Sequence, residues 1–270
     1  MHDEAAPPPP TTIDLTTTVY KPTEEETAAQ EQYIATHTEH AHVQPGKVLR
    51  FLRARTLDVK ATHQLLTNHL IWENKWKPNA IALTDVDTKA MDSGCWRYLG
   101  RSEEGVPTVW VQVAKWNPHE YDKDSYEIYL SYFTSNLERQ MTQVTRQIII
   151  FDMEGWALWH AGYMQYIRRL IDIAQNQYPE RLRRVVMVNA PFLFRASWVV
   201  IKPWMDQVTA EKVVFVAGME EISEQFKSLS VSTDILPAKF GGKGGLLVPG
   251  FPEQEKEGVT EEEEKDGLTF

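Results

Sequence analysis

Short apolar segments alternate with helical segments over residues 107–240, and this alternation constrains the fold more than any other feature. The candidate strands lie at 108–114, 147–152, 185–189 and 212–216, and the candidate helices at 125–138, 160–177, 195–205 and 220–228. The run at 148–151 is apolar on both faces, which is typical of a strand that is covered on both sides. Strands that alternate with helices form layers around a largely parallel sheet. The sequence therefore predicts an α/β fold with a mostly parallel or mixed sheet.

A purely helical pattern precedes this region. Apolar residues recur at helical spacing from Val48 to Trp72, and Pro78 ends the run. We therefore expect a helical module at 31–80 and a separate α/β domain at 90–247. The flanking segments contain little apolar surface, so residues 1–30 are predicted to be a disordered, acidic and proline-rich arm, and residues 253–270 a disordered acidic tail.

The net charge of −10 is confined to these two ends. Residues 1–31 hold seven acids and one lysine, and residues 253–270 hold eight acids and two lysines, so the rest of the chain carries +2. Strong nucleic-acid binding requires a clearly basic domain, so no nucleic-acid partner is expected.

The sequence shows no sign of membrane insertion or secretion. No apolar run reaches the ~18 residues that span a bilayer, and the acidic start is unlike a signal peptide. Cys95 is the only cysteine, so no internal disulfide is possible. We expect a soluble, cytoplasmic monomer.

The segment at 192–216 contains a helix that is apolar on nearly every side. Phe194, Trp198, Ile201 and Trp204 recur at spacings of four, three and three, and most intervening positions are also apolar. A surface helix normally has a polar face. This helix is therefore either buried in a core, or it covers an apolar site and moves.

Motifs for covalent catalysis are missing. There is no G-x-S-x-G, H-E-x-x-H or Cys-x-x-Cys pattern. The glycine-rich run at 241–245 lacks the first glycine and the Ser/Thr of a phosphate-binding loop, so we interpret it as a turn. Asp152 and Glu154 could pair as acid and base, although carboxylates at strand ends more often bond the backbone or a basic neighbour.

Three histidines, His37, His40 and His42, lie close together in the sequence. They could bind a metal, but we interpret them as an accidental cluster. The sequence thus predicts neither an enzyme nor a metal or cofactor site.

Six segments, in this order, resemble the CRAL-TRIO lipid-binding family. They are VLRFLRARTLDV (48–59), IIIFDMEG (148–155), IAQNQYPERL (173–182), VVMVNAPFLF (185–194), IKPWMDQVTAEK (201–212) and LPAKFGGKGG (236–245). The likeness is greatest to the branch that transfers phosphatidylinositol. It implies a helical module packed on an α/β lobe, a lipid pocket floored by the sheet, and a mobile gate helix near 194–205.

The resemblance also assigns site residues. Glu180 and Lys212 match the positions that hold the phosphoinositol head group. Gly241 and Gly242 match a hinge-like glycine turn, which we interpret as structural. The residues expected to line the pocket and the gate are Trp110, Ile149, Phe194, Trp198, Ile201 and Trp204.

Other family positions differ. An Arg-Lys pair of the head-group site is replaced by Glu73 and Asn74, with Lys75 and Lys77 close by. The hydroxyl pair that holds choline lipids is replaced by Gln147 and Ile149, which argues against phosphatidylcholine, and haem is not expected either.

The resemblance implies a carrier that exchanges phosphatidylinositol between membranes, touches them transiently and needs no cofactor. Two alternatives stay open: a carrier of another apolar ligand, such as a sterol, tocopherol or retinoid, and a lipid-sensing interaction module without transfer activity.

Overall fold

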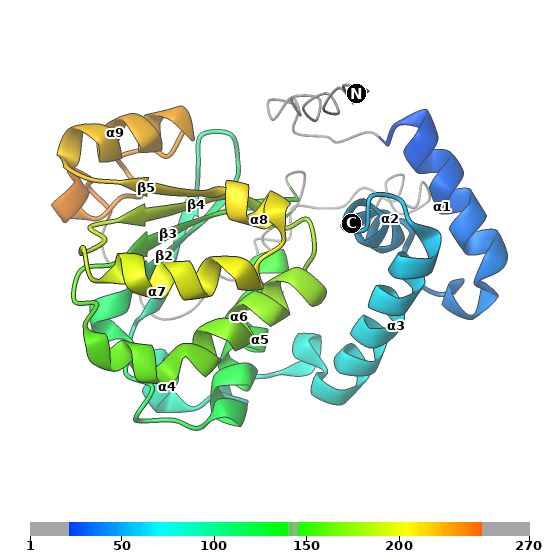
Figure 1. Ribbon diagram of the computed structural model, residues 1–270, viewed down its shortest axis with the longest axis horizontal. Helices are drawn as coiled ribbons and strands as arrows, with labels where there is room; N and C mark the ends of the chain where they lie inside the picture. Colours follow the sequence, from blue (N-terminus) through cyan, green and yellow to red (C-terminus); the bar gives the residue numbers. More distant parts are fainter. Residues whose placement is uncertain (1–21, 140, 142–144, 245–270) are drawn as a thin grey trace, which may run out of the picture.

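The structure is a computed structural model that describes residues 22–139, 141 and 145–244 (Figure 1). The predicted acidic tail and most of the predicted N-terminal arm lie outside these residues. Within the part of the chain that the structure describes, no helix has the length and apolar character needed to cross a membrane.

A five-stranded mixed sheet forms the centre of the larger lobe, with strand order β1-β2-β3-β4-β5. The outer strand β1 pairs antiparallel with β2, and β2 to β5 are parallel. The strands are β1 (Trp96–Arg101), β2 (Pro107–Gln112), β3 (Gln147–Asp152), β4 (Leu182–Val188) and β5 (Val213–Val216). The predicted α/β fold with a mostly parallel or mixed sheet is confirmed.

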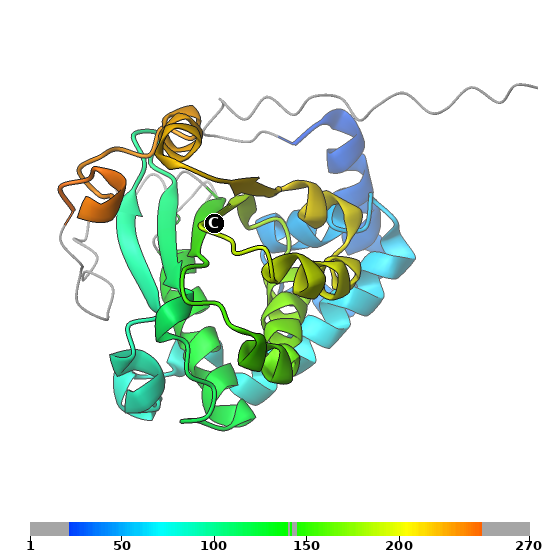
Figure 2. The same cartoon turned by 60° about the vertical axis from the view of Figure 1, so that its left-hand side comes forward.

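Helices cover both faces of this sheet, and side-chain alternation sends successive residues to opposite layers. On one face, Ile148, Ile150 and Val186 pack with the helix α9 and with Phe240. On the other face, Val185 and other sheet residues pack with a larger group of helices. The lobe helices are α4 (Thr88–Asp92), α5 (Lys123–Arg139), α6 (Met164–Asn176), α7 (Phe194–Ile201), α8 (Gln207–Glu211) and α9 (Met219–Ser228). Figure 2 shows the sheet and its helical layers from a second direction.

A smaller helical module lies beside the lobe, in blue and cyan in Figure 1. It consists of α1 (Glu24–Thr36), α2 (Pro45–Arg53) and α3 (Val59–Trp76) around a core that includes Tyr33, Phe51 and Leu66. The indole of Trp72 on α3 donates to Glu127 of the lobe at 3.2 Å. A polar contact of 3.1 Å also joins His69 to Gln177. These contacts dock α3 against α5 and the end of α6.

The sequence-based boundaries are accurate for the parallel strands but fail at the sheet edge. The four predicted strands are present, and their ends differ from the prediction by at most three residues. The antiparallel strand β1 was not predicted, because Arg97, Gly100 and Arg101 interrupt its apolar pattern. Edge strands accept charged residues and bulges, and β1 has an irregularity between Tyr98 and Gly100.

The prediction of a disordered arm up to residue 30 is wrong for its last residues, because α1 begins at Glu24. Thr23 and Glu26 form a capping box, with hydrogen bonds of 3.2 Å and 2.9 Å. Glu26 also pairs with Arg53 of α2 at 2.8 Å. These contacts order a segment whose composition alone favours disorder.

The glycine turn after β5 and α9 is packed too tightly for side chains. A Cβ on Gly242 would lie 1.9 Å from the carbonyl oxygen of Leu236. The backbone N–H of Gly242 donates to Pro237, and that of Gly244 donates to Leu236. Gly241 has a φ of 74°, which favours glycine.

We predict that Gly242→Ala lowers the free energy of unfolding by about 1–3 kcal/mol, because the turn must open to admit the methyl group. Denaturant unfolding of the full chain measures this change. Gly46→Ala is the matched control, since a Cβ at Gly46 meets no heavy atom within 4 Å. Equal stability of the two variants would contradict the packing argument.

Candidate functional site

A cavity of about 190 Å³ lies between the sheet and the helices α5, α6 and α7. Its wall is mostly apolar and includes Ile149 and Phe151 from β3, Val185 and Met187 from β4, and Ile171 from α6. Pockets that hold drug-sized ligands span about 300–1,000 Å³. A ligand of that size or larger therefore requires the wall to move.

Four of the six predicted pocket residues line this cavity: Ile149, Phe194, Trp198 and Ile201. Phe194 and Ile201 are almost fully buried, and Trp198 is packed against the same core. The helix α7 thus lies closed over the cavity.

The prediction for Trp110 is wrong. Its side chain is 2% exposed in the opposite core, where its ring packs edge-on against Phe240. Its neighbours Val109 and Val111 belong to the cavity-side core instead. Because strand residues alternate between faces, an error of one position moves a side chain to the other side of the sheet.

Trp204, predicted as a pocket or gate residue, packs against the cavity-side core but is not among the residues that line the cavity. It lies in a 3₁₀ turn, η6 (Lys202–Trp204), that follows α7. Arg168 lies over its ring at 5.8 Å from the centroid, and Gln175 donates to its carbonyl at 3.1 Å. The next residue, Met205, lines the cavity instead. The helical spacing that suggested Trp204 ends where α7 gives way to the turn.

Three tryptophans that line the cavity were not predicted: Trp96, Trp116 and Trp156. Trp96 lies on the unpredicted strand β1, and Trp156 packs edge-on against Phe194 of α7. Their aromatic content was visible in the sequence, but only the fold brings these distant positions together.

One end of the cavity is polar, at the N-terminal ends of the parallel strands. Gln147, Glu138 and Arg181 lie there among the lining residues. The amide oxygen of Gln147 is buried, and no residue that the structure describes donates a hydrogen bond to it. A buried acceptor without a partner costs stability, and a ligand with a hydrogen-bond donor would satisfy it.

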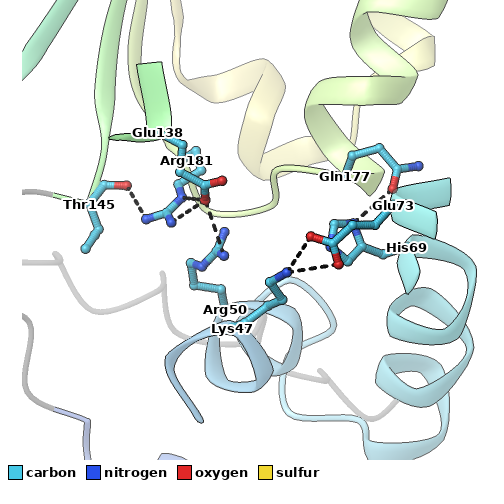
Figure 3. Close-up of polar contacts among 8 residues, drawn as sticks. All are labelled: Lys47, Arg50, His69, Glu73, Glu138, Thr145, Gln177 and Arg181. Carbon is cyan, nitrogen blue, oxygen red and sulfur yellow. Dashed lines mark hydrogen bonds and ion pairs between the residues drawn. The ribbon is translucent and has the colours of Figure 1, made fainter. Parts of the chain in front are cut away.

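A buried charge network connects this polar end to the helical module (Figure 3). Arg181 donates through Nε to Glu138 at 3.0 Å, and Arg50 of α2 lies 3.5 Å from the same carboxylate oxygen. Burial opposes ionisation of Glu138, but the charges of Arg181 and Arg50 prevail and lower its pKa. One carboxylate therefore holds two guanidinium groups at the edge of the cavity.

Arg50 has unused hydrogen-bonding capacity. Its Nη1 is buried, and it has no hydrogen-bond partner among the described residues. Burial, together with the charge of Arg181, lowers the pKa of Arg50 to about 10. Sequence reasoning missed Arg50 because its role depends on α2 docking against the end of the sheet.

The two predicted head-group residues lie near this end but do not line the closed cavity. Glu180 and Lys212 each precede a lining residue, Arg181 and Val213. Arg146 donates to Glu180 at 3.0 Å. Burial lowers the pKa of Lys212, and the charge of Glu180 opposes this shift.

Lys212 has no direct anionic partner among the described residues. Within residues 22–139, 141 and 145–244, its side chain forms no hydrogen bond and no ion pair within 4.0 Å. The carboxylates of Glu180 and Asp206 favour its charged form, and the guanidinium groups of Arg146 and Arg184 oppose it.

The replaced family positions lie on the far end of α3. Glu73 pairs with Lys47 of α2 at 2.9 Å (Figure 3), and Asn74 is exposed. Lys75 and Lys77 are also exposed, and neither lines the cavity.

The outer surface of the gate region is apolar and exposed. Val199 and Val200 on α7 are 73% and 52% exposed, and Phe192 just before the helix is 77% exposed. The helix is therefore apolar on both sides, with one face toward the cavity and the other toward solvent. The helix packs in the cavity-side core and also lines the cavity, and whether it moves stays a prediction.

Asp152 and Glu154 do not form an acid–base pair. Both carboxylates bind Lys239, with a distance of 3.0 Å for Glu154, and Asp152 also accepts from Asn189 at 3.0 Å. These carboxylates at the end of β3 bind a basic neighbour, as the sequence analysis stated to be more common for carboxylates at strand ends.

An α/β lobe with a mostly apolar cavity, a polar end and an apolar helix beside it is typical of a carrier of an apolar ligand. Comparison with known proteins agrees: the model of the CRAL/TRIO domain matches residues 91–242. This chain belongs to the CRAL/TRIO family and is a lipid carrier. The predicted likeness to its phosphatidylinositol-transfer branch is confirmed.

Individual relatives show how broad this similarity is. A SEC14 cytosolic factor from Candida glabrata is 29% identical over 213 residues, which cover 73% of this chain and 70% of that protein. An alpha-tocopherol transfer protein-like protein from Homo sapiens is 30% identical over 212 residues, or 74% and 59% of the two chains. A phosphatidylinositol transfer protein CSR1 from Eremothecium gossypii is 25% identical over 220 residues, or 76% and 48%.

Among solved structures, the crystal structure of Sfh5 matches with a TM-score of 0.59 and 14% identity. The match covers 83% of this chain and 96% of that chain. A likeness at this identity supports the fold alone.

We predict that Glu138→Gln destabilises the protein by about 1–3 kcal/mol at pH 7, because it leaves two buried guanidinium groups without their carboxylate. The lowered pKa of Glu138 stabilises the folded state above the usual carboxyl value of about 4.3, and this contribution is lost as the pH falls through the lowered pKa. The difference from the unmodified chain should therefore shrink as the pH approaches 3. Denaturant unfolding at several pH values measures it.

Glu154→Gln is the control, since that side chain is 69% exposed and its ion pair contributes at most about 1 kcal/mol. A constant difference between Glu138→Gln and the unmodified chain across this pH range would contradict the assignment.

Proposed function

We propose that this protein binds phosphatidylinositol and exchanges it between membranes without covalent catalysis. The acyl chains occupy the apolar cavity under α7, and the phosphorylated head group lies at the polar end. The observation that carries this proposal is the half-buried ammonium group of Lys212 in the field of Glu180, with no ion-pair partner among the described residues.

The charges at this end support an anionic head group. Lys212 has no direct anionic partner among the described residues, and the Nη1 of Arg50, at the Glu138 end of the cavity, has no hydrogen-bond partner there either. A phosphate oxygen accepts charge-assisted hydrogen bonds from such groups. The Oε1 atom of Glu180 accepts no hydrogen bond from the described residues, so it is available to an inositol hydroxyl.

Gln147 supports an inositol lipid over a choline lipid. Its buried amide oxygen needs a donor, which a hydroxyl group supplies. The quaternary ammonium of choline carries no N–H or O–H. A choline head group at this end would leave Gln147 unsatisfied.

The gate supports exchange at a membrane surface. The closed cavity is smaller than a two-chain lipid requires, so α7 must move for loading. Each CH₂ of an acyl chain that leaves water gains ~0.8 kcal/mol, and the cavity must replace most of this gain. The exposed Phe192, Val199 and Val200 supply apolar area for transient contact with the bilayer.

Two relatives are named after different ligands. One is called a phosphatidylinositol transfer protein and another an alpha-tocopherol transfer protein-like protein. The second candidate function is therefore a carrier of a compact lipid with a single hydroxyl group. The buried amide oxygen of Gln147, which accepts no hydrogen bond from the described residues, and the small volume of the cavity favour this candidate.

We predict that protein purified from a eukaryotic host contains phosphatidylinositol, identified by mass spectrometry after native extraction. Lys212→Ala should weaken its binding by roughly 30-fold or more, since removing one partner of a buried charge pair costs about 2–5 kcal/mol. Phosphatidylcholine should bind weakly to either protein. Lys227→Ala is the matched control, because Lys227 is an exposed lysine of α9 on the other face of the sheet.

A bound sterol, tocopherol or retinoid, unaffected by Lys212→Ala, would replace the first function by the second. A chain that carries no lipid and takes none up from vesicles would leave only a role as an interaction module.

We also predict that Val199→Asp slows the transfer of lipid between vesicles severalfold, because a carboxylate on the outer face of α7 opposes contact with the bilayer. Its thermal stability should hardly change, since exposed substitutions usually stay within about 0.5 kcal/mol. Met219→Asp is the control: Met219 is a half-exposed apolar residue on α9, away from the gate. Equal slowing by both variants would remove α7 as the membrane-contacting element.

A further inference from the structure

Three side chains of types that can bind metals lie close together in the helical module. None of them lines the lipid cavity. Glu39 and His40 belong to the 3₁₀ turn η1 (Thr38–His40), and His63 lies on α3. One ligand atom from each lies within 4.8 Å of the others. We propose that these three residues bind a divalent transition-metal cation of the zinc type.

The geometry is close to that of a bound ion. Zinc bonds of about 2.0–2.2 Å place two ligands of one tetrahedral ion about 3.3–3.6 Å apart. His63 Nδ1 already lies 3.7 Å from Glu39 Oε1. Two imidazoles and a carboxylate, with an open fourth position for water, form an established ligand set for zinc.

One nitrogen of the group has no hydrogen-bond partner among the described residues. This nitrogen, Nδ1 of His63, is buried. Such a group costs stability when it is left alone, and coordination of a cation would satisfy it. The side chains of His63 and Glu39 remain 35% and 56% exposed, which leaves a path for the ion.

A second residue orients the buried ligand. The hydroxyl of Tyr33 on α1 bonds Nδ1 of His40 at 2.7 Å, which leaves Nε2 of His40 for the cation. Partners of this kind hold metal-binding imidazoles in one tautomer. Tyr33 has no exposed surface, so this support is rigid.

The neighbouring histidines have other roles. His37 stacks on His63 with 4.3 Å between ring centroids, and its Nδ1 contacts Thr36 and the carbonyl of Tyr33. His42 is exposed and does not belong to the group. From the sequence, we interpreted His37, His40 and His42 as an accidental cluster. In the structure, only His40 of these three belongs to the group, and the other two members are Glu39 and His63. A bound ion would join η1 to α3 and stabilise the helical module.

Zinc chloride titrated calorimetrically into the full, untagged chain after EDTA treatment tests the site. One ion per chain should bind, and the melting temperature should rise with zinc concentration. His63→Ala should abolish both effects, and His42→Ala should preserve them. Cobalt(II) added in place of zinc should show d–d absorption bands that His63→Ala removes.

Tyr33→Phe separates a metal site from simple packing. It keeps the buried ring and removes only the hydroxyl, so it should weaken zinc binding by about tenfold. Glu39→Gln is an exposed variant that should fold normally and bind zinc at least tenfold more weakly. Absence of binding to the unmodified chain, or equal affinity in the folded His63→Ala variant, would overturn the proposal.

Discussion

The two faces of the central sheet are covered in different ways, and the site depends on this difference. Ile148 and Ile150 face a filled core with α9 and Phe240, whereas Ile149 and Phe151 face a cavity. The alternation of side chains along β3 makes both faces apolar and therefore requires a cover on each side. On the cavity side, that cover is a layer of helices that ends in the gate α7, and a ligand can take the place of packed side chains.

At the polar end of the cavity, one carboxylate lies between two guanidinium groups. Glu138 holds Arg50 and Arg181 together, so the helical module and the lobe meet at a shared carboxylate (Figure 3). Taking charges out of water is costly, and a pair is tolerated when hydrogen bonds compensate it. The Nη1 of Arg50 has no hydrogen-bond partner among the described residues, and the half-buried Lys212 has no ion pair among them. The proposed anionic head group would give both cations a partner.

The helical module has a second source of stability in the proposed metal site. Its hydrophobic core is small, and the turn η1 joins α1 to α2 at the edge of that core. A cation held by Glu39, His40 and His63 would connect this turn to α3. Since α2 and α3 also carry Arg50 and Trp72, which contact the lobe, the site lies on the module that supports the polar end of the cavity.

The sequence by itself determined the order of the elements and the family. The apolar runs of β2 to β5 and the spacing within α7 are local patterns, and they predicted strands and a helix close to their observed bounds. The family resemblance, with its implied gate helix near 194–205, also located Ile149, Phe194, Trp198 and Ile201 in the cavity wall. Local periodicity suffices to predict strands and helices because residues that are close in the chain form them.

Only the tertiary structure decided which side chains meet. Trp110 faces the filled core because side chains alternate along β2, so its neighbours Val109 and Val111 face the cavity side. Arg50 of α2 reaches Glu138 of α5, which is far away in the chain, and His63 of α3 reaches Glu39 of η1 past the intervening helix α2. Burial and docking set these contacts, and no local pattern records how two distant helices pack.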